Sequence, residues 1–380
     1  MAAEKNNKTL NVPNLRFPEF SGEWERCTIG DITRNYSLRN KDKIQYPMFS
    51  VTNSRGFVPQ SEQFEDREMI GEDIKAYKII HEGDFAYNPA RINVGSIAKY
   101  DKSEPCMISS LYVCFKALPQ INNEWLMQLL KTPKMNFYYN VNGEGGVRVY
   151  LFYPNFARIR TSYPSLAEQQ KIASFLSLLD QRIETQRKII EKYESLIRGL
   201  YQLLFQNAKY NDFISLGDIS QISNGNSDVK DASMNNDGSL YPFFDRSDEI
   251  KFLPEYLFDK EAIIYPGEGA EFYPRYYNGK FALHQRCYAI YDISTDFIPR
   301  YLYHYCKTQN SYFVRNAVGS TVASLRLDTF KRLQIPAIPT HHQELLVMFL
   351  DKIEAKIECN RTILKKYEDQ KKYLLSTLFI

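Results

Sequence analysis

The stretch EKYESLIRGLYQLLF occupies residues 191–205, and KKYEDQKKYLLSTLF occupies residues 365–379, 174 positions further along the chain. The same shift aligns 158–205 with 332–379 without a gap. Identical pairs include Phe175/Phe349, Leu176/Leu350, Arg187/Arg361, Tyr193/Tyr367 and Phe205/Phe379. An internal repeat fixes which segments fold alike, so it precedes other fold assignments. Two copies are too few for a solenoid, and they predict two equivalent halves.

Both copies carry apolar residues at alternating spacings of four and three, the heptad pattern of a coiled-coil helix. The stripe runs for about five heptads and predicts two long helices that pack on each other. The first seam comprises Ile172, Leu176, Leu179, Ile183, Gln186, Ile190, Tyr193, Ile197, Leu200 and Leu204. The second comprises Leu346, Leu350, Ile353, Ile357, Asn360, Leu364, Tyr367, Lys371, Leu374 and Leu378.

Gln186 and Asn360 occupy the same position in the middle of the two seams. A buried amide is a known device for fixing the register of a coiled coil. A solvated break in the stripe is the alternative. Two helices that face each other about a pseudo-twofold axis in one chain run antiparallel, although the seam could also pair with another protein or a second copy.

The starts of both helices carry capping signals. Ser165–Glu168 and Thr340–Gln343 fit the capping-box pattern, in which the first side chain and the fourth satisfy each other's backbone N–H groups. Prolines precede both starts, and neither helix contains another proline.

The segments between the helices also repeat, more faintly and in the same order. CTIGDITRN (27–35) is similar to ISLGDISQI (214–222), and YPMFSVTN (46–53) to YPFFDRSD (241–248). Short β-rich runs alternate with Gly, Asn and Pro turns and a few helices. The predicted class is therefore α+β, with a curved sheet central to each of two similar domains. The predicted divisions are a tail (1–14), a first domain (15–164), a central helix (165–208), a second domain (209–339) and a terminal helix (340–380).

Composition limits the location and the partners. The chain has 380 residues, 44% of them hydrophobic and 24% charged, and its net charge is only +3. Any nucleic-acid site must therefore be local. No signal peptide and no apolar run of membrane-spanning length is present. Six cysteines show no metal-finger spacing, which favours reduced thiols in the cytoplasm.

Two copies of domain plus long helix resemble the specificity subunit of Type I restriction–modification enzymes. The segments GDFAYNPARINVGSIA (83–98) and NFARIRTSYPSLAEQQKIASFL (155–176) carry the resemblance, which covers nearly the whole chain. The second copy departs from it at PTHHQELLVMFL (339–350).

The resemblance implies two target-recognition domains, each recognising one half of a split double-stranded DNA site. It also implies that the helices act as spacer and as docking surface for two methyltransferase subunits, with restriction–translocase subunits joining later. The chain itself would then have no catalytic residue, metal or cofactor, and S-adenosylmethionine, ATP and Mg would belong to the partners. The unlike domain sequences imply an asymmetric site.

Base recognition favours Arg, Lys, Asn and Gln on loops, because these side chains can form paired hydrogen bonds with base edges. Candidates in the first domain are Thr52, Asn53, Arg55, Asn88, Arg91, Asn93, Arg148 and Tyr150. Candidates in the second are Asn224, Asn226, Arg246, Arg275, Tyr276, Asn278, Lys280, Ser320 and Arg326. Arg275 and Lys280, bracketed by tyrosines, form the best basic–aromatic patch. For each residue alone, an ordinary solvated surface position is the alternative.

Several motifs are missing from the sequence. It has no GxxxxGK phosphate loop, no Gly-rich loop of the kind that binds S-adenosylmethionine, and no Asn-Pro-Pro-aromatic methylation motif. His341 and His342 resemble a metal pair only in isolation, since no third ligand is evident. Two other classes remain open: a nuclease that acts on DNA by itself, and a coiled-coil adaptor without sequence specificity.

Overall fold

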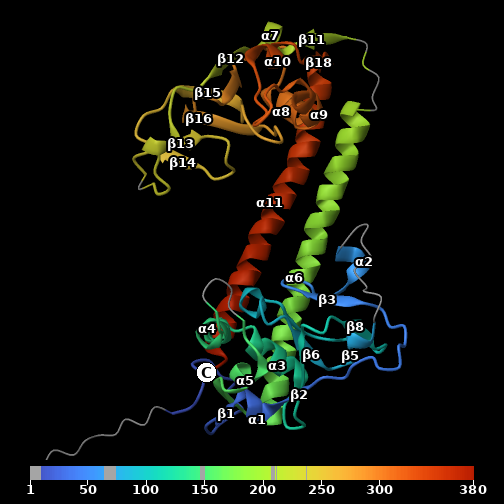
Figure 1. Cartoon of the computed structure of the whole chain (residues 1–380). Helices are drawn as coiled ribbons and strands as arrows, with labels where there is room; N and C mark the ends of the chain where they lie inside the picture. Colours follow the sequence, from blue (N-terminus) through green and yellow to red (C-terminus); the bar gives the residue numbers. More distant parts are fainter. Residues whose placement is uncertain (1–9, 64–73, 146–149, 207–209, 211, 237) are drawn as a thin grey trace, which may run out of the picture. The chain divides into compact units, whose positions relative to one another are not determined.

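The structure is a computed structural model that describes residues 10–63, 74–145, 150–206, 210, 212–236 and 238–380. The described chain forms two compact units. Unit 1 comprises Met1–Gln186 together with Ile363–Ile380, and unit 2 comprises Arg187–Thr362. Each unit therefore contains a globular α+β part and a portion of both long helices (Figure 1). The predicted α+β class with two similar domains and two long helices is confirmed.

The globular part of unit 1 is built on short antiparallel strands. Its largest sheet has the order β2-β9-β6-β7, with bounds Thr33–Tyr36, Val113–Ala117, Phe85–Tyr87 and Ile97–Lys99. Three two-stranded pairs accompany it: β1–β10 (Glu25–Thr28, Arg160–Tyr163), β3–β4 (Phe49–Thr52, Gly56–Pro59) and β5–β8 (Lys78–Ile80, Cys106–Ile108). Its helices are α1 (Ile29–Ile32), α2 (Gln60–Gln63), α3 (Asn123–Leu130), α4 (Pro133–Asn142) and α5 (Tyr153–Ala157).

Unit 2 repeats this plan around a larger sheet. The order is β12-β17-β15-β16-β13-β14, with bounds Gln221–Asn224, Tyr288–Tyr291, Phe258–Tyr265, Arg275–Leu283, Tyr241–Phe244 and Lys251–Leu253. Only the β13–β16 pair is parallel among these described strands. A separate pair joins β11 (Phe213–Ser215) to β18 (Gln334–Pro336). Its helices are α7 (Leu216–Ile219), α8 (Pro299–Lys307), α9 (Asn310–Asn316) and α10 (Leu327–Lys331).

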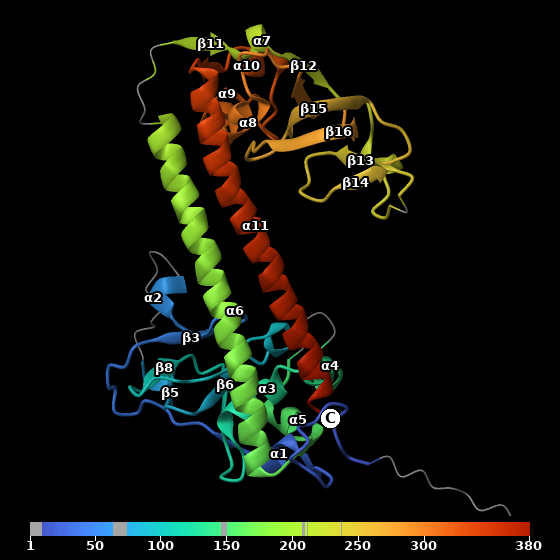
Figure 2. The ribbon, with the colours of Figure 1, turned by 180° about the vertical axis from the view of Figure 1, so that it is seen from behind.

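The two long helices are α6 (Leu166–Tyr201) and α11 (Thr340–Thr377), and α6 continues into a π-helical turn at Gln202–Gln206. Helix α6 begins in unit 1 and ends in unit 2, whereas α11 begins in unit 2 and ends in unit 1. Within each unit the two helices therefore pack in opposite directions, as both views of the ribbon show (Figures 1 and 2).

The predicted heptad seams are the packed faces of these helices, since every seam residue is buried or half-buried. In unit 1, residues such as Leu176 and Ile183 pack with Leu374 and Leu378 in one core. In unit 2, Ile197 packs with Leu350 and similar residues of α11. Polar contacts join the helices as well: Lys371 pairs with Asp180 in unit 1, and Arg361 pairs with Glu194 in unit 2 at 2.6 Å.

The two mid-seam amides differ in their surroundings. Gln186 is 8% exposed, as expected for a residue that fixes register. Asn360 is half-buried, and its Nδ2 donates to the Lys356 carbonyl of its own helix at 2.6 Å. That local bond gives Asn360 a partner without the other helix, so the role of both residues in register stays a prediction.

A buried glutamine near the start of each long helix performs the same task in both units. In unit 1, Oε1 of Gln169 accepts from the Asn122 N–H, and Nε2 donates to two carbonyls, those of Gln120 and Pro164. Gln169 and its counterpart in unit 2, Gln343, are both fully buried. Each joins the start of a long helix to the N-terminus of α3 or α8, because it satisfies backbone groups that the helix ends leave open.

In unit 2, Oε1 of Gln343 accepts from the Ile298 N–H at 2.8 Å. Its Nε2 donates to the Asp296 and Ile338 carbonyls, each at 2.9 Å. The internal repeat thus extends from sequence to individual hydrogen bonds.

The predicted capping boxes are wrong in their reciprocal half. Oγ of Ser165 does accept from the Glu168 N–H at 3.4 Å. The Glu168 carboxylate, however, forms a buried ion pair with Arg16 at 2.7 Å and accepts from Trp24 Nε1. In the second copy the Gln343 side chain bonds to Ile298, Asp296 and Ile338. Tertiary partners therefore take the side chains that the local motif assigns to the backbone.

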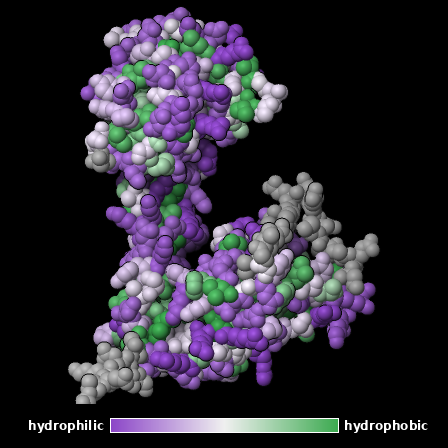
Figure 3. Space-filling model, turned by 60° about the vertical axis from the view of Figure 1, so that its left-hand side comes forward, coloured by the Kyte–Doolittle hydropathy of each residue, from purple (hydrophilic) through white to green (hydrophobic). Residues whose placement is uncertain are grey.

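No helix among the described residues is both long and apolar enough to cross a membrane. Figure 3 shows one face of the molecule, on which hydrophilic side chains predominate and hydrophobic ones lie between them in small groups. Some exposed hydrophobic residues lie on the long helices: Phe175, Leu178, Leu196, Leu345, Met348 and Phe349. Leu345, Met348 and Phe349 are neighbours on one face of α11, and a group of neighbouring exposed apolar side chains favours contact with another protein.

Candidate nucleic-acid interface

The β3–β4 hairpin of unit 1 presents the first group of predicted residues. Oγ1 of Thr52 accepts from the Arg55 N–H at 3.1 Å and donates to the Gly56 carbonyl at 3.2 Å, so this hydroxyl closes the turn. Asn53 and Arg55 are exposed at the tip. Arg55 meets Glu62 at 3.6 Å, but both side chains are more than half exposed. Such a pair is weak in water, so the Arg55 guanidinium remains accessible to a ligand.

The loop after β6 presents the second group. Oδ1 of Asn88 accepts from the Ala90 N–H at 3.0 Å, while Arg91 is exposed. The Asn93 amide donates to Asn140 of α4 at 2.9 Å. Gly95 has φ +100°, and a Cβ there would lie 3.1 Å from the Asn53 carbonyl oxygen. The loop and the hairpin tip are therefore direct neighbours.

The third group of unit 1 lies beside the same loop. The Leu151 N–H donates to the Pro89 carbonyl at 3.0 Å, which holds Tyr150 near the second group. The Tyr150 ring is 38% exposed and lies nearly parallel to that of Phe152, with centroids 6.3 Å apart. Arg148, also predicted, lies outside the described residues. The structure thus brings three predicted segments of unit 1 to one place.

A cavity of about 300 Å³ adjoins this loop and contains two polar residues that sequence reasoning missed, Lys131 and Asn136. Both belong to the α3–α4 region, and Asn93, Val94 and Gly95 line the same cavity. Neither stands in a Gly-rich turn, so composition offered no reason to select them. Their position depends on the packing of α4 against the loop.

Unit 2 has a cavity of about 510 Å³ near some of the predicted residues. Arg246 lines it directly. Asn224 donates from Nδ2 to the carbonyl of Gln285, another lining residue, at 3.3 Å, and the Asn226 N–H donates to the Leu283 carbonyl at 3.1 Å. Both asparagines are exposed. The β12 end and the β13 end therefore meet at one opening.

The loop that contains Ser320 reaches the same cavity by backbone hydrogen bonds. The Leu325 N–H donates to Gly267, and the Gly269 N–H donates to Ala323, at 2.8 and 3.0 Å. Gly267 lines the cavity. Ser320 and Arg326 are both exposed on this loop and at the start of α10. Arg326 therefore directly follows a residue that is bonded to the cavity lining, whereas Ser320 lies in the turn between the bridged residues Val318 and Ser324.

The Arg275 side chain makes most of its contacts within unit 2. Its guanidinium donates to the Ser247 carbonyl at 2.8 Å and to the Asp245 carbonyl, and it lies 5.2 Å from the Phe244 ring centroid. Burial lowers the pKa of Arg275. The residue holds the 245–247 loop in place, so a contact of its own with DNA stays a prediction.

The basic–aromatic patch expected at 273–280 is divided by the strand. Successive side chains of β16 point to opposite faces of the sheet, so Tyr276, Asn278 and Lys280 share one face and Arg275 lies on the other. Asn278 and Lys280 are exposed, and Lys280 Nζ lies 4.7 Å from the Tyr256 ring centroid. Tyr276 donates to Glu261.

The cavity of unit 2 carries charges of both signs. Asp245 is 3% exposed and pairs with Lys251, and Arg286 pairs with Glu268. Burial opposes ionisation of Asp245, but hydrogen bonds from Lys251 and Ser247 outweigh it and hold the pKa of this carboxyl below its ordinary value. Sequence reasoning missed Lys251, Gln285 and Arg286. A mixed surface of this kind offers both donors and acceptors to base edges.

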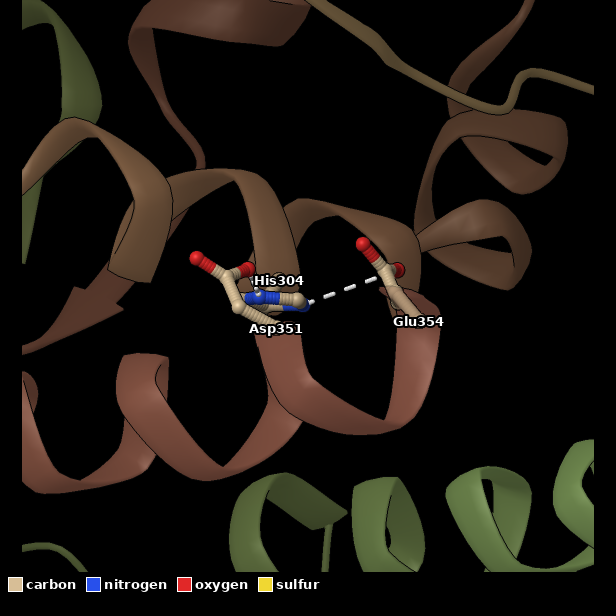
Figure 4. A group of neighbouring side chains, drawn as sticks. All are labelled: His304, Asp351 and Glu354. Carbon is tan, nitrogen blue, oxygen red and sulfur yellow. Dashed lines mark hydrogen bonds and ion pairs between the residues drawn. The ribbon is translucent and has the colours of Figure 1, made fainter. Parts of the chain in front are cut away.

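One side-chain cluster of unit 2 has the donor types of a metal site. Ligand atoms of His304, Asp351 and Glu354 lie within 4.8 Å of one another (Figure 4). The carboxylates, however, already bind cations of the chain: Arg300 contacts both, and Lys307 contacts Glu354. The cluster therefore joins α8 to α11 through ion pairs. The histidines considered from sequence, His341 and His342, are exposed and belong to no such group among the described residues.

Comparisons with known proteins identify the family and the fold of the chain. The family model described as the Type I restriction modification DNA specificity domain matches residues 21–194 and again 209–368. The Type I restriction–modification S subunit from M. genitalium is structurally similar, with a TM-score of 0.66 at 14% identity over 97% of this chain and 99% of that one.

A second solved structure, from work on complex assembly and conformational transition of the type I restriction–modification system, gives a TM-score of 0.56 at 13% identity. It covers 95% of this chain and 98% of that one. No curated relative matches the sequence.

Proposed function

Because the chain belongs to the Type I restriction modification DNA specificity domain family, with two copies of that domain, we propose that each unit recognises one half of a split DNA sequence. Sequence-specific DNA recognition is the role of the family. The finer assignment rests on one observation: each unit gathers its own set of exposed polar loops, and the two sets differ in residue type and in geometry.

The difference between the two sets supports unequal half-sites. In unit 1 the candidate surface consists of a hairpin tip, a loop and an exposed tyrosine. In unit 2 it surrounds a cavity lined by charges of both signs. Base edges are distinguished by their donor and acceptor patterns, so unlike side-chain sets select unlike sequences. The whole target would be asymmetric and bipartite.

The proposal assigns the long helices two further tasks, spacing the two half-sites and docking two methyltransferase subunits. Outward apolar residues support the docking task, because Leu345, Met348 and Phe349 lie at helical spacings of three and four, and exposed apolar groups of this kind mark protein contact surfaces. Restriction–translocase subunits would join the same assembly.

Chemistry is assigned to the partners in this proposal, with S-adenosylmethionine, ATP and Mg bound there. The absence from the sequence of phosphate-loop and methylation motifs supports that assignment. We also propose a cytoplasmic location, since the six cysteines are free thiols and such thiols persist in a reducing compartment.

The test is to purify the chain together with its methyltransferase subunits and map the modified bases on a plasmid. The proposal predicts one motif with two specified parts and an unspecified gap between them, the two parts being different sequences. Modification without sequence preference would refute it, as would DNA cleavage by the chain alone in the presence of a divalent metal.

A further inference from the structure

A second polar cavity of unit 1 lies apart from the candidate interface. Its volume is about 470 Å³, and it forms where the β1–β10 pair meets the first turn of α4. The lining includes three cationic residues, Arg26, Lys134 and Arg160, together with Thr28 and Asp31. None of these was among the predicted DNA-binding residues.

The strand register places the two arginines together. Arg26 pairs with Ser162, and Thr28 pairs with Arg160, so all four side chains lie on one face of the β1–β10 ribbon. Arg26 and Arg160 are diagonal neighbours on that face, and both are exposed. Like charges so placed repel each other, and a bound anion would relieve that repulsion.

The third cation is placed against the usual preference of helices. Lys134 lies in the first turn of α4, which contains no acidic residue. The N-terminus of a helix carries a partial positive charge and favours anions there. A lysine at this position adds to that charge, so the cavity is more positive than its side chains alone would make it.

The acidic residues nearby do not neutralise the three cations. The Asp31 carboxylate accepts hydrogen bonds from the N–H and Oγ1 of Thr28, at 2.7 and 2.8 Å. Within the part of the chain that the structure describes, Arg26, Lys134 and Arg160 form no ion pair. The lining side chains are three cations and one carboxylate, and the lining keeps a net positive charge even when the α-carboxylate of Ile380, the last residue of the sequence, is counted.

The shared fold does not require this cavity to be basic. In unit 2 the corresponding pair is β11–β18, where Ser215 pairs with Gln334 as Thr28 pairs with Arg160. The residue two positions before Ser215 is Phe213, which corresponds to Arg26. The two arginines thus have an aromatic residue and an amide as counterparts, which makes the basic cavity a specific property of unit 1.

We propose that this cavity binds a phosphate of the DNA backbone beside the half-site of unit 1, an inference that rests on the proposed function. Arg and Lys are the usual phosphate ligands, and phosphate contacts position a protein on the duplex. Helix α4 connects the two places: Lys134 lies in its first turn, and Asn140, six residues later, contacts Asn93 of the candidate interface. Six helical residues span about 9 Å, a distance of two to three nucleotide steps along one strand.

An acidic protein segment is the other class of polyanion that three cations could attract. Protein interfaces usually centre on buried aromatic or aliphatic anchors. The lining here has only Tyr138 and Ile380 as large apolar groups, and the remaining side chains are polar or small. The cavity therefore fits a phosphate group better than a protein segment.

The test measures DNA binding by the full chain, with its methyltransferase subunits, from 50 to 200 mM salt. The double variant Arg26→Gln/Arg160→Gln is compared with Arg26→Lys/Arg160→Lys, which keeps the charge. The matched control is Arg182→Gln, an exposed arginine of α6 outside the cavity. Loss of one phosphate contact should reduce the slope of log affinity against log salt by about 0.9. The decrease in affinity over this range should then be about threefold smaller, equally for target and non-target DNA.

The glutamine double variant should show this change, whereas the lysine variant and the control should keep the original slope. The methylated motif should stay the same in all of them. An unchanged slope in the glutamine variant would overturn the inference. Lost assembly with an unchanged slope would overturn it in favour of an acidic protein segment. If the original chain itself lacks a split motif, the proposed function fails, which is a separate result.

Discussion

The paired glutamines lead to a direct test of how the long helices are anchored. Gln343 is fully buried and makes three hydrogen bonds, one from the Ile298 N–H and two to the Asp296 and Ile338 carbonyls. In Gln343→Leu the side chain keeps a similar volume but loses all three bonds. A buried backbone group left without a partner costs about 1–3 kcal/mol. We expect the free energy of unfolding of unit 2 to fall by about 3–5 kcal/mol, because water will hydrate some of the three backbone groups that lose their partner.

Gln343→Glu refines the test. Its carboxylate can still accept from Ile298, but its second oxygen then faces two carbonyl oxygens. Protonation of the glutamate restores a donor, so this variant should regain stability as the pH falls. The matched control is Gln370→Leu, an exposed position of the same helix, which should change stability by less than about 0.5 kcal/mol.

The assay combines urea denaturation of the full chain with hydrogen exchange resolved to single amides. Exchange is needed because a chain with two units need not unfold in one step. In Gln343→Leu the Ile298 amide should exchange faster, while the Asn122 amide, which Gln169 protects in unit 1, should not change. Equal stability of Gln343→Leu and Gln370→Leu would refute the reasoning.

Three further predictions concern charged side chains. Burial lowers the pKa of His304 from its ordinary value of 6.5, so the unfolded chain binds a proton first and the stability of the folded chain should decline below about pH 6.5. The variant His304→Gln should remove that part of the decline in urea midpoints. An identical pH profile of the variant would contradict the assignment. Arg275→Ala should lower the melting temperature of unit 2 and disturb DNA binding through the 245–247 loop. Arg246→Ala should leave the melting temperature unchanged and cost about 1–3 kcal/mol in specific binding. If Arg275 contacts bases itself, calorimetry and titration of target DNA would show the opposite ranking of the two variants. Arg16→Ala leaves the Glu168 carboxylate, 1% exposed, without its cation and should cost about 3–5 kcal/mol, while Arg16→Met combined with Glu168→Gln should cost much less in the same denaturation assay.

The long helices and their seams could be predicted because a heptad pattern can be recognised within one segment of sequence, and the apolar residues of that pattern are the ones that become buried. Every seam residue is buried or half-buried, even Lys371, whose ammonium reaches Asp180. The repeat also predicted two similar α+β domains. These features depend on periodicity, which a single sequence displays.

The side-chain partners could not be predicted, because they join residues far apart in the chain. Glu168 fits a capping box, yet its partner Arg16 lies 152 residues away. Gln169 and Gln343 are identical in the repeat, but nothing local distinguishes them from the exposed glutamines of the same helices. Arg275 and Lys280 are close in sequence, and strand alternation separates them.

That the candidate residues contact DNA stays a prediction, and only the positions of some of them in the fold could be anticipated from the sequence. Turn-forming segments identified Asn53 and Arg246 as exposed loop residues, and the structure places both in such positions. Lys131 and Arg286 were missed because only tertiary packing places them beside those loops.

The most direct test of the account is whether the two units specify their half-sites independently. Complexes that contain Asn53→Ala/Arg55→Ala in unit 1, or Arg246→Ala in unit 2, would be compared by mapping the modified bases of a whole genome. The account predicts that each variant relaxes one part of the motif and leaves the other part and the gap unchanged. If either variant alters both parts together, or the motif is a single uninterrupted sequence, the account is contradicted.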